Sequence, residues 1–185
     1  MRVLPELHVV RQFYINSNIM LESNICCYLL TEGDRGRLSY RGYTIDLVHR
    51  LRQHQGILAG GARYTKRFRQ CRVLVYISGF TTKRSAQSFE WHTKRKTKLS
   101  FVPMVGIARS WVGSKHHYQL FERFCSTLFH PKFDRIRSSL VIHVSSKECI
   151  GNPGHDSGGR IVVECFSETL RWVSKRCIQK LNSES

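Results

Sequence analysis

A short apolar run in the first half of the chain places the strongest restriction on the fold. The residues Val73-Leu74-Val75-Tyr76-Ile77 are apolar on both of their alternating faces. Successive side chains of a strand point to opposite sides of the sheet, so this run predicts a central strand that is buried on each side. A sheet with two buried faces needs a covering layer on both. We therefore expect an α/β (α+β) fold in which helices flank the sheet.

Two runs earlier in the chain are expected to form further strands of the same sheet. Residues 26–30 form a compact apolar run, and residues 38–43 form a second strand-like run. The segment between them, Glu-Gly-Asp-Arg-Gly at 32–36, is typical of a turn. These features predict an antiparallel hairpin with a longer loop. Together with the central run, the hairpin gives a small three-stranded antiparallel sheet.

An amphipathic helix is predicted directly after the hairpin. Leu47, Val48 and Leu51 recur at helical spacing and should face the core. Thr44 is the expected N-cap, and Gly56 stands where a glycine commonly ends a helix.

The rest of the chain is predicted to be mainly helical. Thr82 is the expected N-cap of a helix that runs through Glu90. Beyond residue 99 we predict helices over 118–129 and 167–181, a strand over 140–144 and a glycine-rich loop over 152–159.

Charge is the most unusual property of the composition. The chain has 30 Lys and Arg against 13 Asp and Glu, a net charge of +17. Ten of these cations lie between residues 35 and 72, where Asp46 is the only acid. Such a bias is typical of proteins that bind polyanions, most often nucleic acid, although a generally solubilising surface is the alternative interpretation.

The N-terminal sequence, the lengths of the apolar runs and the cysteines narrow the class of protein further. The N-terminus lacks the apolar segment of a signal peptide, and no run of about 18 apolar residues could span a bilayer. We expect an intracellular protein, in the nucleus or another compartment that holds DNA, without a membrane partner. The seven cysteines include no C-x-x-C pair, so neither a disulfide framework nor a four-ligand zinc site is indicated.

Two rival sites in the second half of the chain are weak. One is a set of cysteines and a histidine that could bind a metal ion. The long, irregular spacings between these residues make buried or free thiols the better interpretation. The other is Asp156-Ser157-Gly158-Gly159, which matches the tetrapeptide around the nucleophile of chymotrypsin-like proteases. A glycine-rich loop explains it better, because the chain is short for two β-barrels. The metal set would comprise Cys149, His155, Cys165 and Cys177.

A lone carboxylate is the first candidate for chemistry. Glu90 is the only acid between Lys83 and Lys98. Hydrolysis of a phosphodiester needs a nucleophilic water, a base and positive charge, and a hard cation such as Mg2+ or Mn2+ prefers oxygen ligands. Glu90 is therefore the natural metal ligand, and an ordinary ion pair with a lysine on an exposed helix face is the alternative.

Four further side chains complete a candidate site. Arg50 and His54 share a stripe of the predicted helix, because they are four residues apart. Arg50 can hold a phosphate through its planar guanidinium, and Tyr28 and Tyr40 can present hydroxyls from adjacent strands. We expect these groups and Glu90 to meet around one phosphate. Singly, strand tyrosines are more often packing residues.

The ordered set resembles the GIY-YIG endonuclease superfamily, and within it the SLX-type structure-specific endonuclease subunit. The resemblance covers residues 26–91 and rests on five short motifs. They are Tyr-Leu-Leu at 28–30, Tyr-Arg-Gly-Tyr-Thr at 40–44, Arg50 with His54, Gly-Gly-Ala at 60–62 and Phe-Glu-Trp at 89–91.

The resemblance implies a role for each motif residue. One of the two tyrosines would activate water, Arg50 would be the catalytic arginine, and Glu90 would bind one Mg2+ or Mn2+. Gly42 would keep the cleft open, and Thr65 follows Gly-Gly-Ala where related nucleases contact substrate. The implied catalytic set is Tyr28, Tyr40, Arg50, His54 and Glu90. The expected DNA-binding set is Arg41, Arg52, Arg63, Tyr64, Lys66, Arg67 and Arg69.

The sequence departs from the family pattern in three places. Cys26 replaces the glycine of the first motif, and Arg41 replaces the aliphatic residue of the second. The cysteine spacing also cannot build the RING-like zinc domain that usually docks a scaffold partner. Dependence on a scaffold therefore stays open, as does the oligomeric state.

The implied function is metal-dependent cleavage of branched DNA such as flaps, forks and junctions, in repair, recombination or replication. A non-catalytic basic nucleic-acid-binding module on the same fold is the alternative. We expect an N-terminal extension at 1–24, a nuclease domain at 25–98 and a helical region of unknown role at 99–185.

Overall fold

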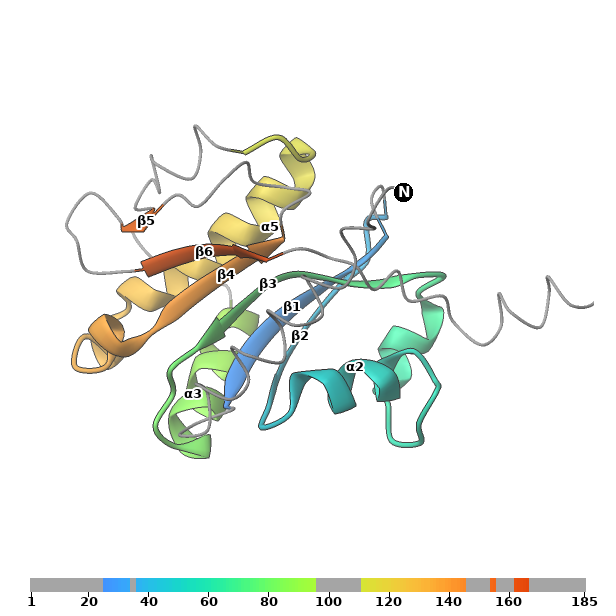
Figure 1. The fold of residues 1–185 in the computed structure, drawn as a ribbon, viewed down its shortest axis with the longest axis horizontal. Coiled ribbons are helices and arrows are strands. Elements are labelled where there is room, and N and C mark those ends of the chain that lie inside the picture. The colour runs from blue at the N-terminus through green and yellow to red at the C-terminus, as the bar shows by residue number, and fades with distance from the viewer. Residues whose placement is uncertain (1–24, 34–35, 96–110, 146–153, 156–161, 167–185) are drawn as a thin grey trace, which may run out of the picture.

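The computed structural model describes residues 25–33, 36–95, 111–145, 154–155 and 162–166, which contain one six-stranded sheet (Figure 1). The strand order is β2-β1-β3-β4-β6-β5, so β2 is an edge strand. Its strands are β1 Cys26–Glu32, β2 Ser39–Thr44, β3 Cys71–Ser78, β4 Val141–Ser145, β5 Gly154–His155 and β6 Val162–Phe166. The helices are α2 Leu47–His54, α3 Lys83–Lys94 and α5 Lys115–Cys125, with 3-10 helices η1 Arg63–Arg67, η2 Ser126–Phe129, η3 Pro131–Phe133 and η4 Arg137–Ser139.

The sheet confirms the three predicted strands and the α+β class, and it extends beyond them. β1 pairs antiparallel with β2 and with β3, and β3 is central and buried as predicted. β4 pairs antiparallel with β3, and β6 pairs parallel with β4. Residues on both sides of position 98 therefore share one sheet. The predicted division into three regions stays a prediction.

Helices cover both faces of the sheet, and each face has its own apolar core. Cys27 and Leu29 of β1 pack with α3 and α5 in the larger core. The alternate residues Tyr28 and Leu30 pack with Leu51 of α2 in the smaller one. Side chains of β1 therefore alternate between two buried layers, and Tyr28 faces α2.

The caps of α2 and α3 agree with the sequence prediction except at one residue, whereas the helix predicted over 118–129 is α5 Lys115–Cys125 followed by η2 Ser126–Phe129. Thr82 caps α3 by accepting a hydrogen bond from the Ser85 N–H at 3.1 Å, and Gly56 follows α2 with a φ of 74°. Thr44, however, does not cap α2. Asp46 does, because its carboxylate accepts from the His49 N–H at 2.8 Å while Thr44 Oγ1 accepts from the Asp46 N–H.

Several predictions lie outside the described residues. They are the extension at 1–24, the helix at 167–181 and most of the loop at 152–159. Four cysteines within the described ranges, Cys26, Cys27, Cys71 and Cys125, are buried free thiols. Of the helices that the structure describes, none has the length and apolarity needed to span a membrane.

Gly42 and Tyr28 face each other across the β1–β2 pair, and their contact requires a glycine. A Cβ at position 42 would lie 2.4 Å from Tyr28 Oη and 2.6 Å from Cζ. Both distances are far shorter than van der Waals contact. The Tyr28 ring therefore occupies the space that a side chain at position 42 would fill.

We predict that Gly42→Ala lowers the free energy of unfolding by about 1–3 kcal/mol, a typical cost of overpacking. Chemical denaturation of Gly42→Ala, Tyr28→Leu and the double variant measures it. The three nearest atoms all belong to Tyr28, so the penalty should largely vanish in the Tyr28→Leu background. Equal losses in both backgrounds would contradict this account.

Candidate active site

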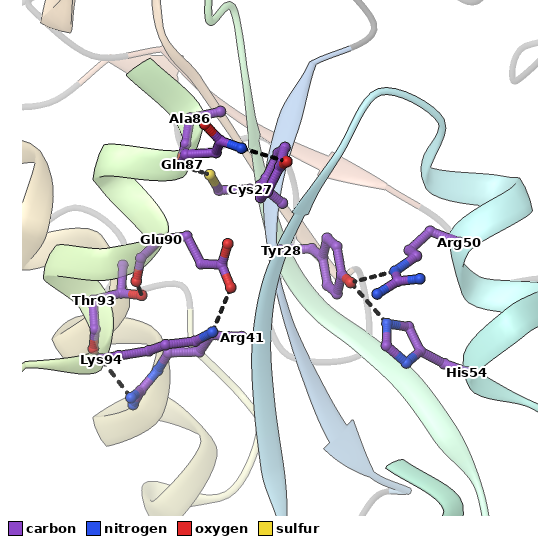
Figure 2. Close-up of polar contacts among 11 residues, drawn as sticks. Cys27, Tyr28, Arg41, Arg50, His54, Ala86, Gln87, Glu90, Thr93 and Lys94 are labelled. Carbon is purple, nitrogen blue, oxygen red and sulfur yellow. Dashed lines mark hydrogen bonds and ion pairs between the residues drawn. The ribbon is translucent and has the colours of Figure 1, made fainter. Parts of the chain in front are cut away.

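The Tyr28 hydroxyl is the centre of the candidate site. His54 Nε2 lies 2.7 Å from Tyr28 Oη, and the Arg50 Nε–H donates to the same oxygen at 3.4 Å. Figure 2 shows both side chains reaching from α2 toward the phenol of β1. Three of the predicted residues therefore meet at one oxygen atom.

Helix α2 brings Arg50 and His54 together because they are separated by four residues. The spacing places both on the helix face that lies over β1, as the sequence predicted. The guanidinium is held in place by two further hydrogen bonds. Arg50 Nη1 donates to Gln53 Oε1 at 2.7 Å and to the Gly60 carbonyl at 3.1 Å.

Tyr40 completes an aromatic cluster on the same face. Its ring centroid lies 6.4 Å from that of Tyr28 and 4.9 Å from that of His54. Tyr40 is the β2 partner of Leu30, so it projects from the face that carries Tyr28. The structure therefore brings together four of the five predicted catalytic residues.

The phenol and the guanidinium influence each other's charge. Burial raises the pKa of Tyr28, and the Arg50 cation lowers it by less, so Tyr28 is a protonated donor at neutral pH. Burial alone would lower the pKa of Arg50, but the hydroxyls of Tyr28 and Tyr40 outweigh it and raise that pKa. Arg50 is therefore a permanent cation beside two phenols.

His54 is a neutral base in this environment. Its side chain is 3% exposed. Burial, followed by the nearby charge of Arg50, lowers its pKa to about 4. At neutral pH one ring nitrogen therefore has a free lone pair, and its position beside Tyr28 allows it to accept the phenol proton.

Thr65 is a site residue that the sequence did not assign correctly. We expected it among substrate contacts, but it is 1% exposed and its Oγ1 lies 2.9 Å from His54 Nδ1. The same hydroxyl donates to the Ala62 carbonyl at 2.9 Å. Only its place after Gly-Gly-Ala could have indicated a role, because a single threonine has no distinctive pattern.

Glu90 lies apart from this cluster. It is on α3, which packs against the opposite face of the sheet, and Figure 2 shows Glu90 and Tyr28 on opposite sides of the strands. Its carboxylate forms an ion pair with Lys94, one turn later. The direct meeting of Glu90 with Arg50 and the tyrosine hydroxyls that the sequence predicts is not seen among these described side chains.

Lys94 spans the gap between Glu90 and the tyrosines. Its ammonium contacts the Glu90 carboxylate and lies 5.9 Å from the Tyr40 ring centroid. The two sites are thus neighbours around β2, which is the edge strand. The ammonium that pairs with Glu90 therefore also lies near the Tyr40 ring, so both groups border the same edge strand.

The predicted DNA-binding residues fall into two groups. Six are on or near η1 and α2 and are exposed: Arg52, Arg63, Tyr64, Lys66, Arg67 and Arg69. Arg41 is different, because it is half-buried and its Nη1 donates to the Thr93 carbonyl at 3.1 Å. Arg41 therefore fastens the end of α3 to β2, which supports the helix that carries Glu90.

The segment that carries this cluster is similar to a known catalytic domain. Residues 24–101 match the GIY-YIG catalytic domain. This part of the chain is a GIY-YIG catalytic domain. Its relatives include structure-specific endonuclease subunit slx1 of Schizosaccharomyces japonicus, 49% identical over 103 residues that make up 44% of this chain and 38% of the relative.

Two other relatives have similar names. SLX1 homolog 1 of Trypanosoma cruzi is 45% identical over 146 residues, 74% of this chain and 26% of the relative. SLX1 of Eremothecium gossypii is 34% identical over 127 residues, 66% of this chain and 42% of the relative. The matched part of the chain thus spans about a quarter to two fifths of the length of these relatives.

The residues of the GIY-YIG domain fit one hard divalent cation. In the part of the chain that the structure describes, no three His, Cys, Asp or Glu residues gather into a metal cluster. A Mg2+ site of one carboxylate, completed by water and substrate phosphate, needs no such cluster. Glu90 meets that need, because it pairs with the half-exposed Lys94, whose ammonium already occupies a cation position beside the carboxylate.

We predict that NMR titration of His54 gives a pKa near 4. Arg50→Gln should raise the pKa but leave it below the ordinary value of about 6.5, because burial by the Tyr28 and Tyr40 rings remains. Arg50→Lys keeps the charge and is the matched control, so its His54 pKa should stay low. A wild-type pKa near 6.5 would contradict the buried, neutral state.

Proposed function

We propose that this chain is a metal-dependent, structure-specific DNA endonuclease. The observation that carries the proposal is the Tyr28 hydroxyl of the GIY-YIG domain, held between neutral His54 and cationic Arg50. A phenol that is linked to a base can pass on a proton, and an adjacent guanidinium can bind phosphate. These are the two protein groups that hydrolysis of a phosphodiester requires.

The proposed step moves two protons and exchanges one bond. A water transfers a proton to Tyr28 Oη as Tyr28 transfers its own proton to His54 Nε2. The water oxygen then bonds to phosphorus, the bond from phosphorus to the leaving oxygen breaks, and the leaving oxygen takes up a proton from solvent. Arg50 donates to the phosphate and stabilises the charge that develops there. Tyr40, on the same face, can position the water.

Glu90 would hold the Mg2+ or Mn2+, which supplies Lewis-acid stabilisation of the phosphate when bound. The substrate backbone would then cross the edge strand β2, with the phosphate between the Tyr28 face and Glu90. Lys94 supports this placement because its ammonium contacts Glu90 and lies near Tyr40. The exposed cations of η1 border the Tyr28 side and would hold the flanking DNA.

The substrate class is proposed from the relatives. Their names describe structure-specific endonuclease subunits, which supports branched DNA such as flaps, forks and junctions as the substrate and a second subunit as a partner. The protein would then act in DNA repair, recombination or replication, in the nucleus or another compartment that holds DNA. Residues 25–98 would carry the chemistry, with regions at 1–24 and 99–185 in supporting roles.

One observation favours a second function. Glu90 is paired with Lys94 and does not touch the tyrosine cluster, as in an ordinary surface ion pair. This arrangement suits a basic DNA-binding module without activity. The neutral His54 beside Tyr28 argues against that alternative, because binding DNA does not require a buried base.

We predict that Glu90→Gln lowers cleavage of branched DNA at least about 100-fold while DNA affinity changes less than about twofold, because a metal ligand acts mainly on the transition state. Labelled flaps, forks, junctions and linear duplexes, with and without Mg2+ or Mn2+, provide the assay. Asp134→Asn, at an exposed acid paired with Arg137, is the matched control and should cut normally. Undiminished cutting by Glu90→Gln would refute its metal role, and wild-type binding without cutting would support the second function.

We also predict that DNA binding depends on the exposed cations of η1. Changing Arg63, Lys66 and Arg67 together to Gln should reduce the salt dependence of duplex binding by about 0.9 for each phosphate that the protein no longer neutralises. The charge-matched control changes three exposed cations near α5 and η3, on the other side of the sheet, and should keep the wild-type slope. These are Lys115, Lys132 and Arg135. Equal effects would indicate that net charge, not this surface, controls binding.

A further inference from the structure

We propose that Thr65 is a positioning residue that fixes His54 in the tautomer able to accept the Tyr28 proton. The tautomer follows from hydrogen-bond geometry alone. Its consequence for cleavage rests on the proposed function. Neither the sequence motifs nor the names of the relatives assign this role to Thr65.

The direction of each hydrogen bond follows from the donors that are present. A threonine hydroxyl has one proton, and Thr65 donates it to the Ala62 carbonyl at 2.9 Å. Thr65 Oγ1 can then only accept from His54, so Nδ1 at 2.9 Å must carry the ring proton. A neutral imidazole has one N–H, which leaves Nε2 as a bare acceptor for the Tyr28 O–H at 2.7 Å.

Because the groups are buried, reversing the direction of these hydrogen bonds would be costly. Thr65 and His54 are both almost fully buried, so a ring N–H without its partner would have no water to replace it. The opposite tautomer would point an N–H at the Tyr28 oxygen, which already accepts from Arg50. It would also leave Nδ1 without a donor. The series of hydrogen bonds from the Ala62 carbonyl through Thr65 and His54 to Tyr28 therefore favours one tautomer of the His54 ring.

The backbone holds Thr65 in place for this contact. Its N–H donates to the Ala62 carbonyl at 3.1 Å, and its carbonyl accepts from the Phe68 N–H at 3.0 Å. Gly61 lets the loop lie directly on α2, because a Cβ there would be 2.2 Å from the Gln53 carbonyl oxygen. The Gly-Gly-Ala segment thus places the hydroxyl against the end of the helix that carries His54.

The charged and titratable groups that face His54 allow a clear test. They are Tyr28 from β1, Tyr40 from β2 and Arg50 from α2. None of these three contacts Nδ1, which faces Thr65. A change of the Thr65 hydroxyl should therefore alter the proton on Nδ1 without removing any group that would contact the phosphate.

The experiment compares wild type, Thr65→Ser and Thr65→Val at pH 7 by nitrogen-15 NMR of the His54 ring, whose two nitrogens show which one is protonated. Wild type and Thr65→Ser should show the proton on Nδ1. Thr65→Val has nearly the same shape but no hydroxyl, and it should show a mixture or the proton on Nε2. A wild-type ring protonated on Nε2 overturns the proposal, whether or not Thr65→Val folds. So does a folded Thr65→Val variant that keeps the Nδ1 proton unchanged.

Cleavage kinetics provide the second readout. We predict that Thr65→Val lowers kcat about 10- to 100-fold with KM within about twofold of wild type, the range of a general-base contribution. Thr65→Ser should retain kcat within about threefold, because it keeps the hydroxyl. Equal kcat values for folded Ser and Val variants would overturn the catalytic part of the proposal. If wild type cuts no DNA while its ring carries the Nδ1 proton, the proposed function fails and the tautomer assignment stands.

Discussion

The hydrogen bond between Tyr28 and His54 depends on the burial of a phenol between a strand and a helix. Tyr28 lies in the smaller core with Leu30 and Leu51, so its ring is a packing element as well as a polar one. Gly42 leaves the space for that ring. Exclusion of water strengthens the bond and raises the cost of leaving either partner unpaired. The same burial keeps Tyr28 protonated and His54 neutral, so the phenol has a proton to donate and the imidazole has a free lone pair to accept it in a hydrogen bond.

Much of this arrangement was predictable from the sequence, because it depends on local periodicity. The two-faced run at 73–77 indicated the central strand, and the four-residue spacing of Arg50 and His54 indicated their shared helix face. Thr65 was not predictable in the same way, because its role comes from a loop that folds back onto α2. Asp46 forms the cap expected for Thr44 because a carboxylate at that position reaches the His49 N–H. The larger sheet was missed because β4 and β6 join it through pairing between distant segments.

The basic character of the chain has more than one structural origin. Arg41 binds the Thr93 carbonyl at the C-terminal end of α3, where the helix dipole favours a cation. The cations of η1 remain exposed to solvent beside the buried Thr65. Net charge alone would have assigned both groups to DNA. Burial separates a cation that stabilises the fold from cations that are accessible to phosphates.

The position of Glu90 can be reconciled with catalysis through the weakness of its present partner. Lys94 is 50% exposed and Glu90 is 17% exposed, and they are one helical turn apart. Helical pairs of this kind contribute about 0.3–0.5 kcal/mol, so on the proposed function a divalent cation would meet little competition from Lys94 for the carboxylate. Released from Glu90, the Lys94 ammonium would remain near the Tyr40 ring, within reach of a phosphate at the edge strand. The ion pair therefore compensates the charge of the Glu90 carboxylate, and on the proposed function it is weak enough for a metal ion to replace it.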